Sequence, residues 1–137
     1  MQIIPYLSFN GNCRVALTFY AELFGGTVGT FMNWNAEAIE NIPGATVEHI
    51  MHGDITLNGF MIAGSDQFGD MYQPGGNISL MLDIDDLVDA QAKFAALAEE
   101  GQVMMPFAET FWADGYGFCT DRFGIQWQIN CTGSKTM

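Results

Sequence analysis

The chain has 137 residues, of which 49% are hydrophobic and only 15% charged, so it can bury a core and does not have the composition of a disordered chain. Sixteen Asp and Glu residues against four Lys and Arg give a formal charge of −12. This excess of negative charge would repel a phosphate backbone or an anionic membrane surface, so we expect neither nucleic acid nor a membrane as a partner.

The chain opens with a predicted strand and a predicted helix. The short apolar run 3–9 indicates a strand, and Pro5 places it at a sheet edge or a strand start because proline donates no backbone hydrogen bond. Either Asn10 or Asn12 is suited to cap the following helix. Apolar residues recur at helical spacing along that helix, and Gly25-Gly26 ends it because glycine readily takes the left-handed conformation.

Strands dominate the rest of the first half. The sequence predicts them over 27–34, 47–57 and 60–63, and Asn58-Gly59 is the strongest hairpin signal in the chain. The segment 35–46 is less regular and has room for one helical turn. It is either a flap over a pocket or an ordinary connection.

The second half repeats this order of elements. A turn-rich linker over 64–76 leads to a strand over 77–84, and Asp85 or Asp86 can cap a helix that Gly101 stops. A strand beginning at 102–105 follows, with a final hairpin formed by 116–120 and 125–131.

A weak internal repeat supports a duplication. Phe19 and Phe94 lie seven residues before Gly26 and Gly101, and each of these glycines is followed by a polar residue and a valine. Both halves therefore predict a βαβββ module, the first over about 1–64 and the second over about 77–131.

The stretch 107–130 holds most of the candidate binding residues. It contains two of the three tryptophans, a Gly-flanked Tyr116 and the alternating run 125–129. Large aromatic side chains beside polar groups are typical of a concave ligand site. The alternative is an amphipathic hairpin whose aromatic residues only fill a core.

The three cysteines, Cys13, Cys119 and Cys131, are widely spaced and form no C-x-x-C pair. An odd number of such residues predicts reduced thiols rather than disulfides or a zinc knuckle. The start of the chain has no basic segment followed by a long apolar run, so we expect no signal peptide and a cytoplasmic protein.

Three motifs give the chain a family resemblance: FNGNCRVALTFYAELFGG near the start, MHGDITLNG in the middle and TFWADGYGFCTDRFGIQWQIN near the end. Together they resemble the PhnB-like branch of the vicinal oxygen chelate superfamily, which includes glyoxalase I, bleomycin-resistance proteins and extradiol dioxygenases. Members of this branch are often labelled 3-demethylubiquinone-9 3-methyltransferase. The resemblance implies a single α+β domain of paired βαβββ modules, forming a curved mixed sheet with the helices outside, and a homodimer.

Metal-dependent members of the superfamily bind a divalent ion through four ligands, usually His, Glu or Gln. The resemblance places these positions at or next to Pro5, at or near His52, at Asn77 and at Gln128. Of these, His52 is a good ligand, Gln128 and Asn77 offer neutral amides, and Pro5 offers no donor. We therefore expect no complete metal site and no required cofactor, with a weak divalent-metal site at His52 and Gln128 as the alternative.

His52 lies two residues from Asp54, so in a strand the two side chains share a face. Such a pair is either a general base or a hydrogen-bonded structural pair. Cys119 could be a nucleophile, but no basic residue close in sequence would lower its pKa, so a buried apolar role is the other interpretation. No Gly-rich turn follows a strand to grip a nucleotide-like cofactor, which argues against methyl transfer.

The sequence thus predicts a PhnB-like protein that binds a small molecule. The predicted pocket residues are Phe31, Trp34, His52, Phe111, Trp112, Tyr116 and Gln128. One alternative is a metal-dependent lyase or dioxygenase that uses His52 and Gln128. The other is a structural or regulatory module whose interior is only a packed core.

Overall fold

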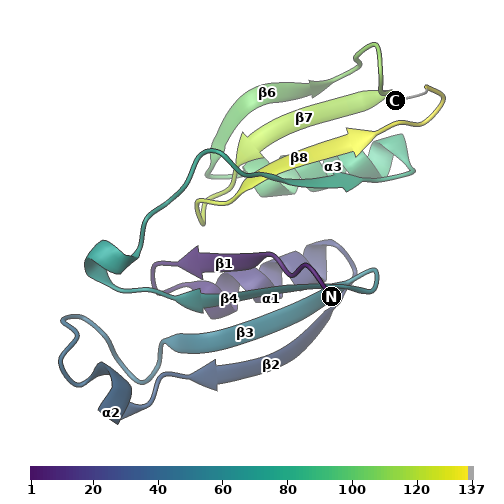
Figure 1. The fold of residues 1–137 in the computed structure, drawn as a ribbon. Helices are drawn as coiled ribbons and strands as arrows, with labels where there is room; N and C mark the ends of the chain where they lie inside the picture. Colours follow the sequence, from purple (N-terminus) through teal and green to yellow (C-terminus); the bar gives the residue numbers. More distant parts are fainter. Residues whose placement is uncertain (136–137) are drawn as a thin grey trace. The chain divides into compact units, whose positions relative to one another are not determined.

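The computed structural model describes residues 1–135 and divides into two compact units, Met1–Pro74 and Gly75–Met137 (Figure 1). Each unit is a βαβββ module with one four-stranded mixed sheet and one long helix. The predicted α+β class with paired modules is therefore confirmed. In residues 1–135, no helix is long and apolar enough to span a membrane.

Unit 1 contains the first module. Its sheet has the order β1-β4-β3-β2, with β1 parallel to β4 and the other neighbours antiparallel. Its elements are β1 (Tyr6–Phe9), α1 (Cys13–Leu23), β2 (Thr27–Asn33), α2 (Ala36–Ile39), β3 (Ile50–Leu57), β4 (Phe60–Asp66) and the 3-10 turn η1 (Gly69–Met71).

Unit 2 repeats this topology with the order β5-β8-β7-β6, in which β5 runs parallel to β8. Its elements are β5 (Leu80–Asp83), α3 (Leu87–Ala98), β6 (Gln102–Ala108), β7 (Gly115–Thr120) and β8 (Gln126–Cys131).

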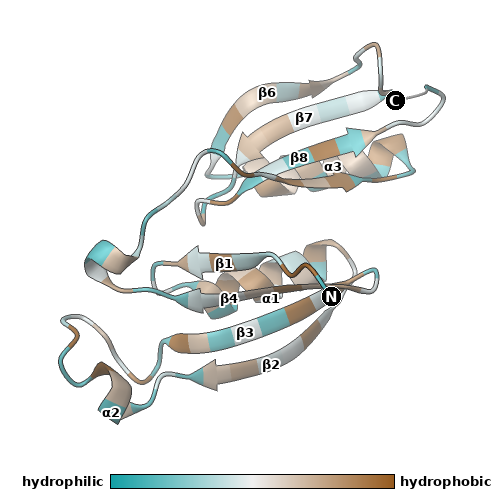
Figure 2. Cartoon of the chain, viewed as in Figure 1, coloured by the Kyte–Doolittle hydropathy of each residue, from teal (hydrophilic) through white to brown (hydrophobic). Residues whose placement is uncertain are grey.

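In each unit, the helix covers one face of the sheet. Leu17 of α1 is fully buried, as is Leu97 of α3. Buried and half-buried residues alternate over 52–57 of β3, and polar and apolar residues alternate along β8 (Figure 2), so each strand presents one face to its helix and the other away from it.

Glycine is required after each of the two long helices for the same structural reason. A Cβ on Gly26 would clash with the carbonyl oxygen of Thr56, and a Cβ on Gly101 would clash with that of Thr120. The chain leaves each helix so close to the sheet that only glycine fits. This shared constraint explains the repeat seen in the sequence.

The two long helices are capped differently. Asp86 caps α3 as predicted, because its carboxylate accepts the N–H of Asp89 at 2.9 Å. At α1, however, Asn12 occupies the cap position without a side-chain bond. The buried Asp66 accepts the N–H of Cys13 at 2.9 Å and that of Ile50 at 2.8 Å, so the cap comes from the end of β4.

Three strands begin three residues later than the sequence predicts. β1 begins at Tyr6, not at Ile3, since the parallel pairing with β4 starts where Pro5 O accepts the N–H of Ala63. The strand predicted from position 47 begins at Ile50, because a turn precedes it, with the N–H of His49 bonded to Thr46 O. The strand predicted from position 77 begins at Leu80.

Candidate functional site

The sheet of unit 1 has one face toward α1 and one away from it, which we call the open face of unit 1. Gly53 faces α1, because a Cβ there would stand 3.2 Å from Cδ1 of Leu17. Its neighbours His52 and Asp54 therefore project from the open face. Tyr6 joins them, since it pairs with Ala63, which in turn pairs with Asp54.

These three side chains form a hydrogen-bonded row, the Tyr6–His52–Asp54 row. Tyr6 Oη lies 3.2 Å from His52 Nδ1, and His52 Nε2 lies 3.0 Å from Asp54 Oδ2. The other carboxylate oxygen of Asp54 accepts the N–H of Thr30 at 3.2 Å. An ionised carboxylate only accepts, so Nε2 carries the imidazole proton and Nδ1 accepts from the Tyr6 hydroxyl.

The row is fixed yet accessible. The His52 side chain is 30% exposed, and Tyr6 is 53% exposed. The Tyr6 hydroxyl donates a hydrogen bond to His52, and its oxygen keeps lone pairs that can accept a hydrogen bond from a ligand. The row can therefore orient a polar group placed on the open face.

Unit 2 has a corresponding open face, away from α3. Gly117 faces α3, where a Cβ would crowd the Phe94 ring, so Tyr116 projects from the open face. Tyr116 Oη donates to Gln128 Oε1 at 2.6 Å, and Gln128 Nε2 donates to Ser79 Oγ at 2.7 Å. Burial raises the pKa of Tyr116, so the phenol remains a neutral donor.

Two more aromatic rings continue from Tyr116. The Trp112 ring packs edge-on against the Tyr116 ring, with 5.3 Å between the ring centroids. The Phe111 ring packs edge-on against Trp112, with 4.9 Å between the centroids. The indole N–H of Trp112 donates to Oδ1 of Asn130, which is fully buried, at 3.1 Å. Phe111 is 89% exposed, so this aromatic cluster of Phe111, Trp112 and Tyr116 extends from a fixed base to solvent.

The C-terminal segment holds the loop that carries this cluster. Lys135 Nζ donates to Glu109 Oε2 at 2.7 Å and to Thr110 O at 2.6 Å. Asp114 accepts from the backbone and hydroxyl of Ser134 at 2.9 and 2.8 Å, and these bonds lower the pKa of Asp114. The Asp114 charge is thus paired with the tail.

The structure brings together four of the seven predicted pocket residues, namely Phe111, Trp112, Tyr116 and Gln128. His52 lies on the open face of unit 1. Phe31 lies beside Gly53 on the face of the sheet that packs on α1. The guanidinium carbon of Arg14 stands 4.6 Å from the centroid of its ring. Phe31 is therefore on the opposite face from His52.

Trp34, the remaining predicted pocket residue, follows β2. Its indole N–H donates to Asp66 O at 3.2 Å, and its ring lies 5.9 Å from that of Phe68. The sequence did not indicate Ser79 as the partner of Gln128 or Asn130 as the partner of Trp112. Both come from outside the 107–120 loop and strand, and only the sheet pairing brings them into contact.

At two of the expected metal positions, His52 and Gln128, the side-chain donor atoms are engaged within the protein. His52 has a partner on each nitrogen, and the Gln128 amide has a partner on each end. Asn77 lies in the bend before β5. Within residues 1–135, no three His, Cys, Asp or Glu side chains gather into a potential metal site. These residues are a poor match for a divalent ion, which prefers several anionic or imidazole ligands.

All three cysteines are buried and free. Burial, with the nearby carboxylate of Asp66 adding to it, raises the pKa of Cys13 to about 12, and burial raises that of Cys119 to about 11. A thiol that keeps its proton is a poor nucleophile, so the structure favours a packing role for Cys119.

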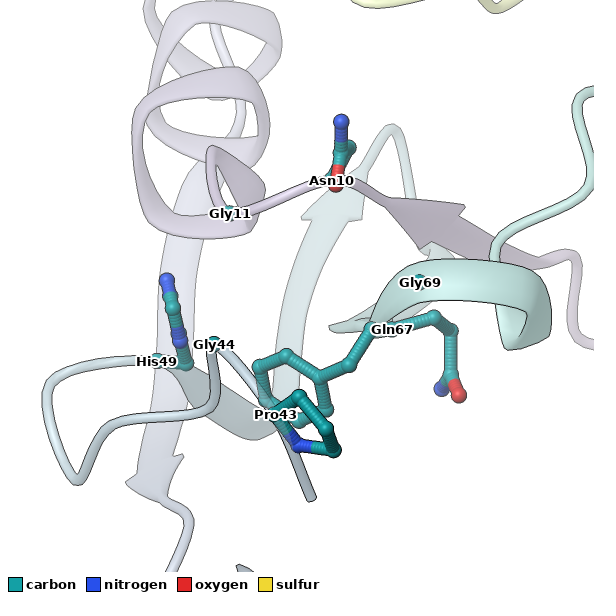
Figure 3. A pocket seen from close by; sticks show the side chains of 8 residues that line it. Asn10, Gly11, Pro43, Gly44, His49, Gln67 and Gly69 are labelled. Atoms are coloured by element: carbon teal, nitrogen blue, oxygen red, sulfur yellow. The ribbon is translucent and has the colours of Figure 1, made fainter.

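Unit 1 also contains a pocket of about 280 Å³ that the sequence indicated only as one interpretation of segment 35–46 (Figure 3). Pro43 and Gly44 of this segment line it, as a flap would. The other lining residues are Asn10, Gly11, His49, Gln67, Phe68 and Gly69.

Comparison with known proteins identifies the class. Residues 1–130 match the family model described as 3-demethylubiquinone-9 3-methyltransferase. The chain is 32% identical to Protein YjdN of Escherichia coli (strain K12) over 95% of both chains. It is 38% identical to protein PA1353 of Pseudomonas aeruginosa, whose crystal structure superposes with a TM-score of 0.79 over 96% of this chain and 97% of that one.

More distant structures share the fold. A PhnB protein of Bacillus cereus is 24% identical, with a TM-score of 0.81 over 96% of this chain and 99% of that one. The fosfomycin resistance protein FosX of Listeria monocytogenes is 10% identical, with a TM-score of 0.61 over 96% and 90%. The fold is thus that of the vicinal oxygen chelate superfamily. The chain belongs to the 3-demethylubiquinone-9 3-methyltransferase-like (PhnB) family.

Proposed function

We propose that this chain is a PhnB-like small-molecule-binding protein without a complete metal site. The observation that carries the proposal is the hydrogen bonding on the open faces. Both nitrogens of His52 and both ends of the Gln128 amide are engaged within the protein. Such bonds hold polar groups beside aromatic rings in fixed positions, which is how small-molecule sites obtain orientation and specificity.

The charge balance narrows the ligand class. The formal charge of −12 disfavours an anion. The aromatic cluster offers ring faces and edges that can stack on a planar group or attract a cation. We therefore propose a neutral or cationic ligand with a planar portion.

A thermal-shift screen tests this proposal. The compounds are neutral planar aromatics, each with a cationic and a carboxylate analogue, because a ligand that binds the folded state raises Tm by mass action. We expect stabilisation by neutral or cationic members, loss of the effect in Trp112→Ala and no loss in Val88→Ala, a control at a solvent-exposed position of α3. Stabilisation that survives in Trp112→Ala would remove the aromatic cluster from the site.

A metal-dependent lyase or dioxygenase is the second candidate. The observation in its favour is the bond from His52 Nε2 to Asp54, because imidazoles that bind metal usually donate their other N–H to a carboxylate. In this case the metal would take Nδ1 in place of the Tyr6 hydroxyl and act as a Lewis acid.

Metal analysis distinguishes the two candidates. The protein is purified without chelators, its metal content is measured, and Tm is followed with added Zn, Ni, Mn or Fe. The binding-protein proposal expects no stoichiometric metal. A stoichiometric metal that is lost in His52→Ala would establish the second candidate instead.

We do not propose methyl transfer. A turn that binds a nucleotide-like cofactor needs several glycines between a strand and the helix that follows it. Here the β1–α1 turn holds only the single glycine Gly11, the pair Gly25-Gly26 follows α1, and the pair Gly75-Gly76 precedes β5. A homodimer is proposed from the family resemblance, and elution of the protein as a monomer in gel filtration would contradict it.

A further inference from the structure

The pocket in unit 1 is separate from the open-face residues of the proposed site. It lies where the β1–α1 turn, the α2–β3 loop and the segment after β4 meet (Figure 3). None of the residues of the Tyr6–His52–Asp54 row lines it. A molecule in this pocket would therefore contact a different set of groups.

His49 supplies a free hydrogen-bond donor in the pocket. Its Nδ1 accepts the N–H of Thr46 at 3.2 Å, so the neutral ring carries its proton on Nε2. Nε2 has no hydrogen-bond partner within residues 1–135. Figure 3 shows the ring directed toward the turn at Gly11. A donor that lines a cavity without a partner in the protein can donate to an acceptor oxygen of a ligand.

Gly11 leaves room for this donor. Its φ of +93° is one that L side chains rarely adopt, and a Cβ there would stand 3.3 Å from His49 Nε2. Any side chain at this position would therefore crowd His49 Nε2, whereas glycine does not.

The other walls favour a ring. The rings of His49 and Phe68 lie 5.1 Å apart at 55°, and Pro43 adds another apolar surface. The volume of about 280 Å³ is below the range of about 300–1,000 Å³ that holds drug-sized ligands. It exceeds the cavity of about 150 Å³ that accommodates benzene in an engineered protein. A single-ring molecule fits these limits.

The electrostatics favour a neutral ligand. No Lys or Arg is among the lining residues. Asp66, the neighbour of the lining residue Gln67, is a buried acidic residue that accepts two backbone N–H groups. A ligand carboxylate would lie near this acidic side chain without a Lys or Arg in the lining to compensate it.

We propose that this pocket is a second binding site, selective for a small neutral single-ring compound with one acceptor oxygen that receives the His49 Nε2–H. This site is independent of the proposed function on the open faces. Its chemistry is that of an aromatic amide, in which the ring packs on Phe68 and Pro43 and the carbonyl faces His49.

NMR titration of the whole chain tests the proposal. The probes are benzamide, toluene without an acceptor, and benzoate with a negative charge. We expect benzamide to shift the backbone amides of Gly11, Gly44 and Gly69 and to bind at least about fivefold more tightly than toluene, the difference that one hydrogen bond makes. Benzoate should produce no saturable shift at these glycines.

Two variants separate the donor from the fold. His49→Asn can still accept the N–H of Thr46 but cannot reach the ligand, so we expect benzamide to lose about fivefold more affinity than toluene, which loses only its packing on the imidazole. Val88→Ala, at a solvent-exposed position of α3 outside both proposed sites, should leave both affinities unchanged. Failure of benzamide to shift the three glycines, or equal binding by His49→Asn, would overturn the second site. Neither result would bear on ligands that depend on Trp112.

Discussion

Asp66 is the single residue on which the ends of three elements of unit 1 depend. At the end of β4, its carboxylate accepts the N–H of Cys13 in α1 and the N–H of Ile50 in β3. It is 1% exposed, so water cannot replace these bonds. Neither the helix start nor the strand start has another side-chain acceptor for the same N–H within the described residues.

Asp66→Asn should therefore destabilise the protein. The amide has one acceptor oxygen, and its NH₂ group would face a backbone N–H, so one buried donor loses its partner. We expect a loss of about 2 kcal/mol in the free energy of unfolding, measured by urea denaturation. Asp70→Asn removes the same charge from an exposed position and is the control. Equal stabilities of the two variants would rule out this role for Asp66.

The buried Cys13 predicts a dependence of stability on alkaline pH. In the unfolded chain, the thiol ionises near its ordinary pKa of 9.0, whereas in the folded chain its pKa is about 12. The unfolded state then binds fewer protons across this window, so the free energy of unfolding falls as pH rises. Cys13→Ala should flatten this fall in urea unfolding above the ordinary pKa. Parallel pH profiles for the two proteins would contradict the prediction.

At the site, the sequence predicted what is local along one strand. The spacing of His52 and Asp54 placed them on one face, and the structure has them 3.0 Å apart. The other partners, Tyr6 and Ser79, are separated from His52 and Gln128 by 46 and 49 positions. Their contacts depend on strand order and register, which no local pattern specifies.

At the scale of elements, the close approach of helix ends to strands is the recurring constraint. Gly101→Ala adds a Cβ that clashes with the carbonyl oxygen of Thr120 in β7. Neither backbone can move without disturbing the β6–β7 pairing that begins at Gln102. We expect a loss of about 2 kcal/mol or more in the free energy of unfolding.

Gly76→Ala is the matched control for this prediction. A Cβ on Gly76 meets nothing within 4 Å, and this glycine precedes β5 in the segment between the units. Its change in the urea midpoint should be small. If Gly101→Ala unfolds at the same urea concentration as Gly76→Ala, the close approach has no energetic importance.

The sequence predicted the boundaries of the helices more accurately than the starts of the strands. The helix predicted after Asp86 ends before Gly101 as expected, because caps and glycines act within a few residues. The strand predicted from Ile3 begins only at Tyr6, and Ile3 is 87% exposed. Its apolar character is local, but pairing with β4 decides where the strand begins.

At the scale of the whole molecule, acidic side chains greatly outnumber basic ones. All four basic residues have aromatic or acidic neighbours. Lys93 pairs with Asp89 at 2.6 Å and Lys135 with Glu109 at 2.7 Å. The guanidinium groups of Arg14 and Arg122 lie over the rings of Phe31 and Phe123. With sixteen acidic side chains in total, most carboxylates have no basic partner.

This imbalance predicts that salt stabilises the protein. Repulsion among carboxylates acts most strongly in the compact state, and the Debye length falls from about 30 Å at 0.01 M to about 10 Å at 0.1 M salt. Screening should therefore raise Tm between these concentrations of NaCl. The ion pairs of Lys93 and Lys135 oppose the effect, but exposed pairs contribute only about 0–1 kcal/mol each.

NaCl and KCl should give the same rise in Tm if screening is the cause, because both salts screen equally at equal ionic strength. A rise with only one of them would indicate specific ion binding. A fall in Tm with both would mean that the few ion pairs outweigh the repulsion. The chain has a formal charge of −12 and only four basic residues. We therefore expect the same rise in Tm with NaCl and with KCl.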